Sequence, residues 1–155
     1  HCIHNEFAYT VIGNREQLHS AFENVIRNAF IYSNPNSIVS AKIETVILEN
    51  HRSALKLSIT DQGSGIDDAD VARIFQPFVR LDASRQRPVS TTASHALDRE
   101  SNSNPHRKRE GGYGLGLAIA QAIIAAHKGQ INARNRQDGT QGLVVEIVLP
   151  VPLNS

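Results

Sequence analysis

Asn24 and Asn28 are two amides four residues apart in a stretch whose apolar residues follow a helical period. Residues at this spacing lie on the same face of a helix. A side-chain amide offers a neutral oxygen, which suits a hard divalent cation that is already paired with phosphates. The alternative is two solvated amides on the flank of an amphipathic helix, and the pair by itself favours that interpretation.

A second group with chemical potential is Asp61, followed by Gly63 and Gly65, at the end of a strand-like stretch. Glycines allow a flat ligand to approach the backbone closely. The carboxylate can accept a hydrogen bond from an exocyclic amine such as that of adenine. An ordinary glycine-rich turn explains the same residues equally well, so this motif alone leaves both interpretations open.

A third group is the glycine series Gly112, Gly114 and Gly116, which opens an apolar helical stretch. Glycines at a helix N-terminus can form an anion site from backbone N–H groups and the helix dipole. The series is not a dinucleotide-binding fingerprint, because Leu117 stands where the third glycine belongs, and no Gly-Lys-Ser/Thr follows as in a P-loop. The alternative is a glycine-rich hinge.

These groups need helices and strands to position them. The apolar residues of the first helix form one stripe, and Asn14 with Gln17 predicts a capping box at its start. β-branched and alternating residues predict strands on either side of two later turns. The expected elements are a short edge strand over 7–12, a helix from about 15 to 32 with the stripe Leu18, Ala21, Phe22, Val25, Ile26, Ala29 and Phe30, strands over 39–48 and 55–59, a short helix over 67–75, a helix over 118–126 ended by Gly129, and strands over 131–136 and 143–149.

Residues 82–110 differ from the rest, because they are rich in Ser, Thr, Asn, Arg and His and show no periodicity. A segment of this length without periodicity is either a functional lid or disordered. The order of elements favours an α+β fold, in which a mixed sheet carries about three helices on one face. We expect residues 1–155 to form a single domain, with the segment 82–110 as a flexible lid within it.

The composition fits a globular domain. The chain has 155 residues, of which 40% are hydrophobic and 20% charged, and this length suits one core. A net charge of +1 argues against a nucleic-acid partner, which would call for a basic excess. No apolar run approaches the ~18 residues of a membrane span, and the single Cys2 excludes an internal disulfide. Methionine is absent even at position 1, so we expect the chain to be a piece of a longer protein.

The three groups recur in a fixed order. Asn-x-x-x-Asn-Ala begins at Asn24, Asp-x-Gly-x-Gly-Ile at Asp61, Ile-Phe-x-x-Phe at Ile74, and Gly-x-Gly-Leu-Gly-Leu at Gly112 after the polar segment. From about residue 11 to 150 the chain therefore resembles the catalytic and ATP-binding domain of bacterial sensor histidine kinases. These belong to the GHKL superfamily of gyrase, Hsp90 and MutL. The resemblance implies a Bergerat-type two-layer sandwich with a long ATP lid and a mostly antiparallel sheet.

The resemblance also implies a role for each matching residue, with ATP and Mg²⁺ as cofactors. Asn28 would coordinate Mg²⁺, and Asn24 would hold phosphates or the metal shell. Asp61 would bind the adenine amine. The other residues implied in nucleotide binding are Tyr32, Gly63, Gly65, Ile66, Phe75, Arg80, Gly112, Gly114, Leu115, Gly116 and Leu117. Arg80 and Arg85 would act beside the two asparagines in catalysis, and Phe78 with Phe75 would form a hinge under the lid.

Three positions depart from the family pattern. Ile31 stands where Lys or Arg often precedes the N-box tyrosine, so Arg80, Arg85 or the lid is expected to supply that cation. Leu143 stands where many members have Thr, which removes a hydroxyl from the vicinity of adenine. An insertion over 88–106 lengthens the lid.

None of the seven histidines stands in the phosphoacceptor motif of the family, so we expect the acceptor histidine on an adjacent dimerisation domain outside this chain. The implied function is a catalytic module that transfers the γ-phosphate of ATP to that histidine and serves a response regulator indirectly. The parent would be a membrane-anchored homodimer, with this domain on the cytoplasmic side of the inner membrane. The alternatives are an ATPase or anti-sigma serine kinase of the same superfamily, and a nucleotide-binding interaction module without chemistry.

The position four residues before Asn28 separates the first of these alternatives from the kinase. Hydrolytic relatives typically carry a Glu there, which can activate water or a hydroxyl. Here the position is Asn24, and the neighbouring Glu23 lies about 100° further round the helix. The sequence therefore favours a histidine kinase over a hydrolase.

Overall fold

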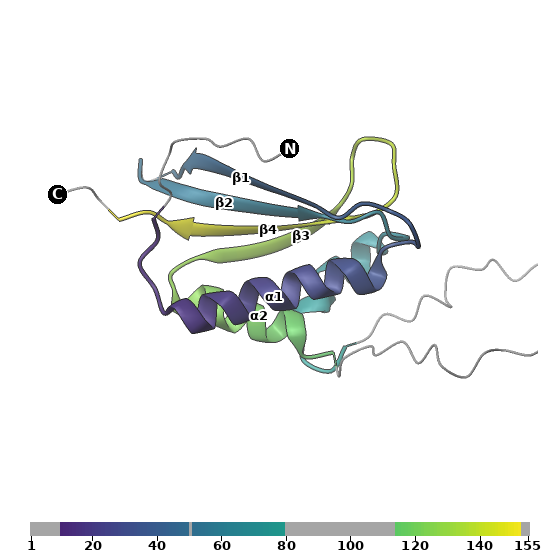
Figure 1. Cartoon of the computed structure of the whole chain (residues 1–155), viewed down its shortest axis with the longest axis horizontal. Helices are drawn as coiled ribbons and strands as arrows, with labels where there is room; N and C mark the ends of the chain where they lie inside the picture. Colours follow the sequence, from purple (N-terminus) through teal and green to yellow (C-terminus); the bar gives the residue numbers. More distant parts are fainter. Residues whose placement is uncertain (1–9, 50, 80–113, 153–155) are drawn as a thin grey trace, which may run out of the picture.

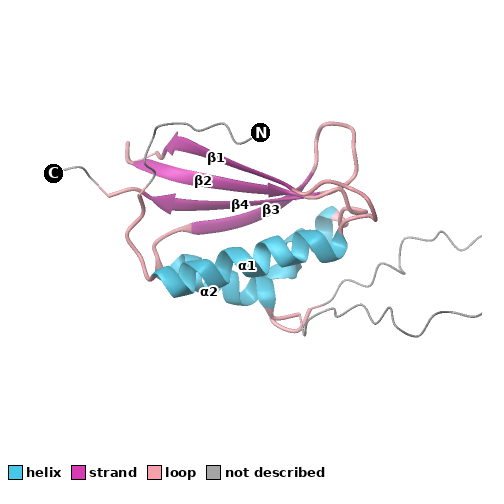
Figure 2. Cartoon of the chain, in the orientation of Figure 1, coloured by secondary structure: helices cyan, strands magenta, loops and turns pink. Residues whose placement is uncertain are grey.

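The computed structural model describes residues 10–49, 51–79 and 114–152. A sheet forms one layer and the helices cover one of its faces (Figure 1, Figure 2). Within the described residues, no helix has the length and apolar character needed to cross a bilayer. The elements are α1 (Arg15–Tyr32), β1 (Ser40–Ile47), β2 (Ser53–Thr60), η1 (Asp68–Phe75), α2 (Gly116–Ala126), β3 (Gln130–Asn135) and β4 (Leu143–Pro150).

The four strands lie in the order β1-β2-β4-β3, and each neighbouring pair is antiparallel. The expected α+β sandwich is therefore confirmed. The expectation of a mixed sheet is not met, because the described strands include no parallel pair. Of the edge strand expected over 7–12, residues 10–12 are not in a strand, and residues 7–9 lie outside the described part.

The core forms between the sheet and the helices. Leu57, Ile147 and Ile131 stand opposite one another on β2, β4 and β3, and successive strand residues alternate between the two faces. This alternation, predicted from Leu55, Leu57 and Ile59, turns an apolar face toward α1 and α2. The buried residues of this core are Leu18, Ala21, Val25, Ala29, Ile59, Phe75, Leu117, Ala120, Ile124, Ile131, Leu143, Val145, Ile147 and Leu149.

The opposite face of the sheet carries charges. Glu44 on β1 accepts hydrogen bonds from Lys42 and from Lys56 on β2, and these bonds lower the pKa of Glu44 to about 2. The same contact raises the pKa of Lys56. This face of the sheet therefore carries a charged cluster across β1 and β2, although Ala54 and Val144 on the same face are buried.

Helix α1 begins at the predicted cap, since the Asn14 side chain accepts a hydrogen bond from the Gln17 N–H. Its buried stripe is narrower than the sequence predicted. Ile26 and Phe30 are 37% and 65% exposed. Each follows a buried residue of the stripe by about 100° of rotation, which places both on a side of the helix that the described residues leave uncovered.

The end of α2 corrects the prediction for Gly129. The left-handed residue after the helix is Lys128, with φ of 59°, and Gly129 N–H bonds back to the Ile124 carbonyl as in a Schellman motif. Position 129 requires glycine for close packing and not for a left-handed conformation, because a Cβ there would lie 2.5 Å from the Val148 carbonyl oxygen. His127 Nε2 accepts the N–H of Asn14, which joins the end of α2 to the start of α1.

Candidate functional site

Asn24 lies where α1 meets the beginning of α2. Its Nδ2 donates to the Ser20 carbonyl at 2.9 Å, and its Oδ1 accepts from the Arg27 guanidinium at 2.9 Å. A Cβ atom built on Gly116 would lie 3.0 Å from the same Oδ1. The first and third motifs of the sequence are therefore in contact, and the glycine at the start of α2 leaves room for the Asn24 amide.

Asn28 stands one turn further along the same face of α1 and is partly buried. Its amide forms no hydrogen bond with any other described residue. The two asparagines thus differ, since the Asn24 oxygen accepts a hydrogen bond from a cation and the Asn28 oxygen has no partner in the described part of the chain. An amide oxygen without a protein partner fits a hard cation such as Mg²⁺ better than one already bonded to a guanidinium.

Asp61 follows β2 and is the buried charged residue of the described core, at 6% exposure. Its Oδ1 accepts the N–H groups of Gly63 at 2.8 Å and Leu143 at 3.1 Å. Oδ2 has no partner among the described residues, and it is not among the fully enclosed polar atoms. One oxygen therefore fixes the carboxylate and the other remains open to accept a donor such as an exocyclic amine.

The loop after Asp61 is tied to the end of α1. Ser33 and Gly63 form an antiparallel bridge, and a Cβ on Gly63 would lie 2.4 Å from the Tyr32 carbonyl oxygen. The Ser33 Oγ is buried without a hydrogen-bond partner in the described part of the chain. Gly63 is thus required for close backbone contact with α1, and a polar atom beside it lacks a protein partner.

Asn135, at the end of β3, binds the backbone of the residue that follows the second glycine of this loop, a role that the sequence analysis missed. Its Oδ1 accepts the Ile66 N–H, and its Nδ2 donates to the Ile66 carbonyl and to Asp68. Gly65 has φ of 71°, and a Cβ there would lie 3.0 Å from the Asn135 Oδ1. No local pattern marks Asn135, because its partners lie far away in the sequence.

Gly142 was also missed. Its φ is 141°, and a Cβ on it would lie 2.2 Å from the Asp61 carbonyl oxygen. The neighbouring Arg136 donates to this carbonyl at 3.4 Å and forms an ion pair with Asp138. Hydrogen bonds from Arg136 and then from Thr140 hold the pKa of Asp138 well below its usual range. The turn between β3 and β4 is therefore in direct contact with the backbone of Asp61.

The segment at the start of α2 has further contacts with the site. The Gly114 carbonyl accepts the N–H of Phe78 at 3.0 Å, and Phe78 itself is 74% exposed. No side chain caps α2, whose N-cap residue is Leu115. Its first N–H groups therefore have no side-chain acceptor among the described residues, as an anion-binding helix start requires.

The remaining predicted site residues divide into two groups. Phe75 and Leu117 are buried in the core, and Ile66 packs against it from the edge. Tyr32 is half exposed, with its carbonyl against Gly63 as described above. Arg80, Arg85, Gly112 and the lid 82–110 lie outside the described residues, as does the insertion 88–106.

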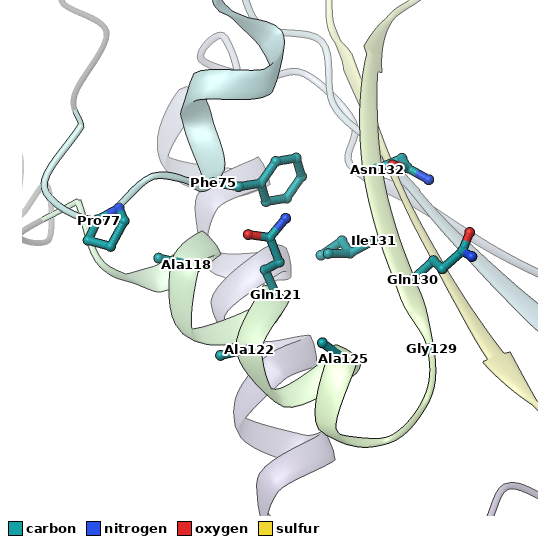
Figure 3. Close-up of a pocket in the computed structure, with 10 residues that line it drawn as sticks. All are labelled: Phe75, Pro77, Ala118, Gln121, Ala122, Ala125, Gly129, Gln130, Ile131 and Asn132. Carbon is teal, nitrogen blue, oxygen red and sulfur yellow. The ribbon is translucent and has the colours of Figure 1, made fainter.

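A groove of about 560 Å³ lies on a different face of α2 (Figure 3). Ala118, Ala122 and Ala125 line it from α2, and Ile131 from β3. Figure 3 shows Gln121 lying between α2 and β3. Of the predicted site residues only Phe75 borders this groove, so it is separate from the surfaces around Asn24 and Asp61.

Among the described residues, no three His, Cys, Asp or Glu side chains gather into a cluster that could hold a metal ion alone. The donor set at Asn28 is instead a single neutral amide oxygen. Mg²⁺ commonly takes only one or two protein ligands and completes its shell with water and substrate phosphates. The residues present thus fit Mg²⁺ delivered with a nucleotide.

Comparisons with known proteins show the family to which the chain belongs. Residues 13–153 match the family described as histidine kinase-, DNA gyrase B-, and HSP90-like ATPase. The chain is 32% identical over 143 residues to the sensor histidine kinase CpxA of Escherichia coli K12, covering 92% of this chain and 25% of the relative. It is 35% identical over 129 residues to the heme sensor protein HssS of Staphylococcus haemolyticus, covering 83% of this chain and 22% of that protein.

Solved structures give the same result. The mycobacterial sensor histidine kinase MprB superposes with a TM-score of 0.67 at 26% identity, covering 94% of this chain and 78% of that one. The catalytic domain of the histidine kinase ThkA superposes with a TM-score of 0.61 over 91% of this chain and 70% of that one. At 20% identity the ThkA match concerns the fold alone. The chain spans about a quarter of the length of the curated relatives given above.

Proposed function

The chain belongs to the histidine kinase-, DNA gyrase B- and HSP90-like ATPase family, and we propose that it is the ATP-binding catalytic module of a two-component sensor histidine kinase. Membership of this family implies ATP binding. The sensor kinases among its relatives support the narrower assignment. The module would bind Mg-ATP and pass the γ-phosphate to a histidine on a separate domain.

The observation that carries the proposal is the identity and position of Asn24. It occupies the place four residues before Asn28 where a hydrolase would carry an activating Glu, and its amide is engaged by Ser20 and Arg27. The adjacent Glu23 lies on an exposed side of α1, with an oxygen 3.9 Å from His19. An imidazole acceptor is itself a nucleophile, so phosphoryl transfer to histidine needs no such base from this chain.

The nucleotide would be held at two ends. The open Oδ2 of Asp61 would accept the adenine amine, and the uncapped start of α2 would face the phosphates. Asn28 would hold Mg²⁺, which when bound neutralises charge on the phosphates. Tyr32, Gly63, Gly65 and Ile66 would surround the base. Arg80, Arg85, Gly112, Gly114, Leu115, Gly116 and Leu117 would lie along the phosphate side, with Phe75 beneath.

In the transfer step, a histidine nitrogen attacks the γ-phosphorus, the bond from phosphorus to the β–γ bridging oxygen breaks, and ADP leaves. The contribution of this chain is positioning and electrostatic stabilisation of the phosphates, as is general for phosphoryl transfer. The acceptor belongs to a dimerisation domain of the parent, from which a response regulator then receives the phosphate. We propose that the parent is a membrane-anchored homodimer with this domain on the cytoplasmic side.

The test uses radiolabelled Mg-ATP with the chain alone and with a histidine-bearing helical hairpin from a related kinase. We expect label on the hairpin that is lost in acid, as phosphohistidine is, together with very slow ATP hydrolysis by the chain alone. Asn28→Ala is the site variant, and Asn132→Ala on the exposed surface of β3 is its control. Rapid hydrolysis by the chain alone would favour the ATPase. Acid-stable phosphoserine on an added protein would favour the serine kinase, and tight ATP binding without phosphate transfer would favour the non-catalytic module.

A further inference from the structure

Arg27 is a cation that the sequence motifs did not include. Its Nη2 donates to the Asn24 Oδ1 at 2.9 Å, and its guanidinium makes no ion pair with a carboxylate among the described residues. A guanidinium has five N–H donors. One bond to Asn24 therefore fixes the direction of the group and leaves most of its donors available.

The position of Arg27 on α1 places it at the phosphate end of the proposed site. Arg27 lies three residues after Asn24, a spacing at which side chains are neighbours on a helix, and it is about 100° of rotation from the adjacent Asn28. Asn24 in turn contacts Gly116 at the uncapped start of α2. A guanidinium and a helix N-terminus thus both adjoin Asn24, and both favour an anion.

The rest of this face of α1 offers no other cation. Ile31, one turn beyond Arg27, is apolar, and Arg27 is the sole basic residue in the second half of the helix. The bond to Asn24 also has a consequence for the metal. A guanidinium on the Asn24 oxygen opposes a second cation there, so Mg²⁺ is left to Asn28 while Arg27 remains for phosphate oxygens.

We infer that Arg27 is a phosphate-binding residue of this site, whose guanidinium is oriented by Asn24 and contacts the phosphate chain of the bound nucleotide. This inference rests on the proposed ATP-binding function. The ordinary explanation is that Arg27 and Asn24 are solvated neighbours on a helix surface with no role in binding. Our inference predicts instead that Arg27 affects the binding of ligands that carry phosphates and not of ligands that lack them.

The experiment compares Mg-ATP and adenosine as ligands of the full 155-residue chain. Calorimetry gives the ATP constant, and heteronuclear NMR gives the adenosine constant even in the millimolar range. The variants are Arg27→Ala and Arg27→Lys, with Arg15→Ala as a control that removes the same charge from the first turn of the same helix. Unchanged NMR spectra outside the vicinity of residue 27 establish that each variant is folded.

We expect Arg27→Ala to weaken Mg-ATP binding about tenfold, a loss typical of one charged hydrogen bond, and to change adenosine binding less than twofold. Arg27→Lys should fall between wild type and Arg27→Ala, and Arg15→Ala should match wild type. An ATP loss below twofold, an equal loss for adenosine, or an equal effect of Arg15→Ala would each overturn the inference. Failure of the wild-type chain to bind either ligand would instead refute the proposed function.

Discussion

Asn24 on α1 and Gly116 on α2 are in contact across the interface of the two helices, so that a Cβ on Gly116 would lie 3.0 Å from the Asn24 Oδ1. This contact joins the amide motif to the glycine motif, which are separated in the sequence by β1, β2, η1 and the segment 82–110. Asn24 and the uncapped start of α2 therefore lie side by side, in the arrangement that the proposed phosphate site uses.

Gly116→Ala tests this contact. The added methyl group is within 3.0 Å of an amide that Ser20 and Arg27 hold on both sides, so the amide must shift. Alanine also favours a helix by up to about 1 kcal/mol relative to glycine. We therefore expect Mg-ATP affinity, measured by calorimetry, to fall several-fold while the melting temperature is unchanged or higher. Unaltered affinity would show that the Asn24 orientation does not matter for the nucleotide.

Asn28→Ala should separate metal from nucleotide. Because the Asn28 amide has no hydrogen bond to another described residue, its removal leaves no buried partner unsatisfied. We expect ATP binding with Mg²⁺ to weaken much more than binding in EDTA. The exposed Asn132→Ala on β3 serves as control. An equal loss with and without Mg²⁺ would mean that Asn28 supports the helix and not the metal.

Gly142→Ala should be the most damaging glycine substitution in the turn between β3 and β4. A φ of 141° and a contact of 2.2 Å with the Asp61 carbonyl oxygen combine backbone strain with overpacking, for a cost of at least about 3 kcal/mol of unfolding free energy. Gly139→Ala is the matched control, since φ is 81° but no atom lies within 4 Å; it should cost about 1 kcal/mol. Urea denaturation measures both, and similar losses would contradict the importance of the contact.

The charged face of the sheet predicts a pH dependence. Hydrogen bonds from Lys42 and Lys56 lower the pKa of Glu44 from 4.5 to about 2, so the folded state favours the carboxylate. The resulting stability is present above pH 4.5 and is lost as the pH falls toward 2. Glu44→Gln should therefore be slightly less stable than wild type at pH 7 and equal to it near pH 2, with Glu49→Gln unaffected at both. A difference that persists in acid would contradict this.

The local patterns of the sequence predicted most elements correctly. The cap at Asn14, the alternation of Leu55, Leu57 and Ile59, and the apolar α2 are set by neighbouring residues, whose spacing can be read directly. The stripe of α1 was predicted too wide at Phe30, because hydrophobicity alone does not show which side of a helix a sheet covers. The left-handed residue after α2 is Lys128 and not Gly129 for a similar reason, since packing against Val148 decided where glycine was needed.

The sequence motifs named the candidate site residues but not the residues that the structure places against them. Asn135 binds both the N–H and the carbonyl of Ile66, Gly142 lies against the Asp61 carbonyl, and Arg27 donates a hydrogen bond to Asn24. The first two join segments far apart in the sequence, and no periodicity marks such pairs. Arg27 was within reach of sequence reasoning, because a spacing of three from Asn24 on a helix implies a shared face. What the sequence did not show is that Arg27 forms no ion pair with a carboxylate in the described part of the chain.

The measurement that bears most directly on the account is the affinity of the wild-type chain and of Asp61→Asn for Mg-ATP and Mg-GTP, determined by calorimetry. Asparagine keeps an oxygen for the N–H groups of Gly63 and Leu143 but presents an amide in place of the open Oδ2, where an adenine amine would no longer be accepted. The account predicts that wild type prefers ATP, and that Asp61→Asn binds ATP at least about tenfold more weakly with the preference over GTP lost and a native circular dichroism spectrum. Equal ATP affinity in wild type and in folded Asp61→Asn would contradict it.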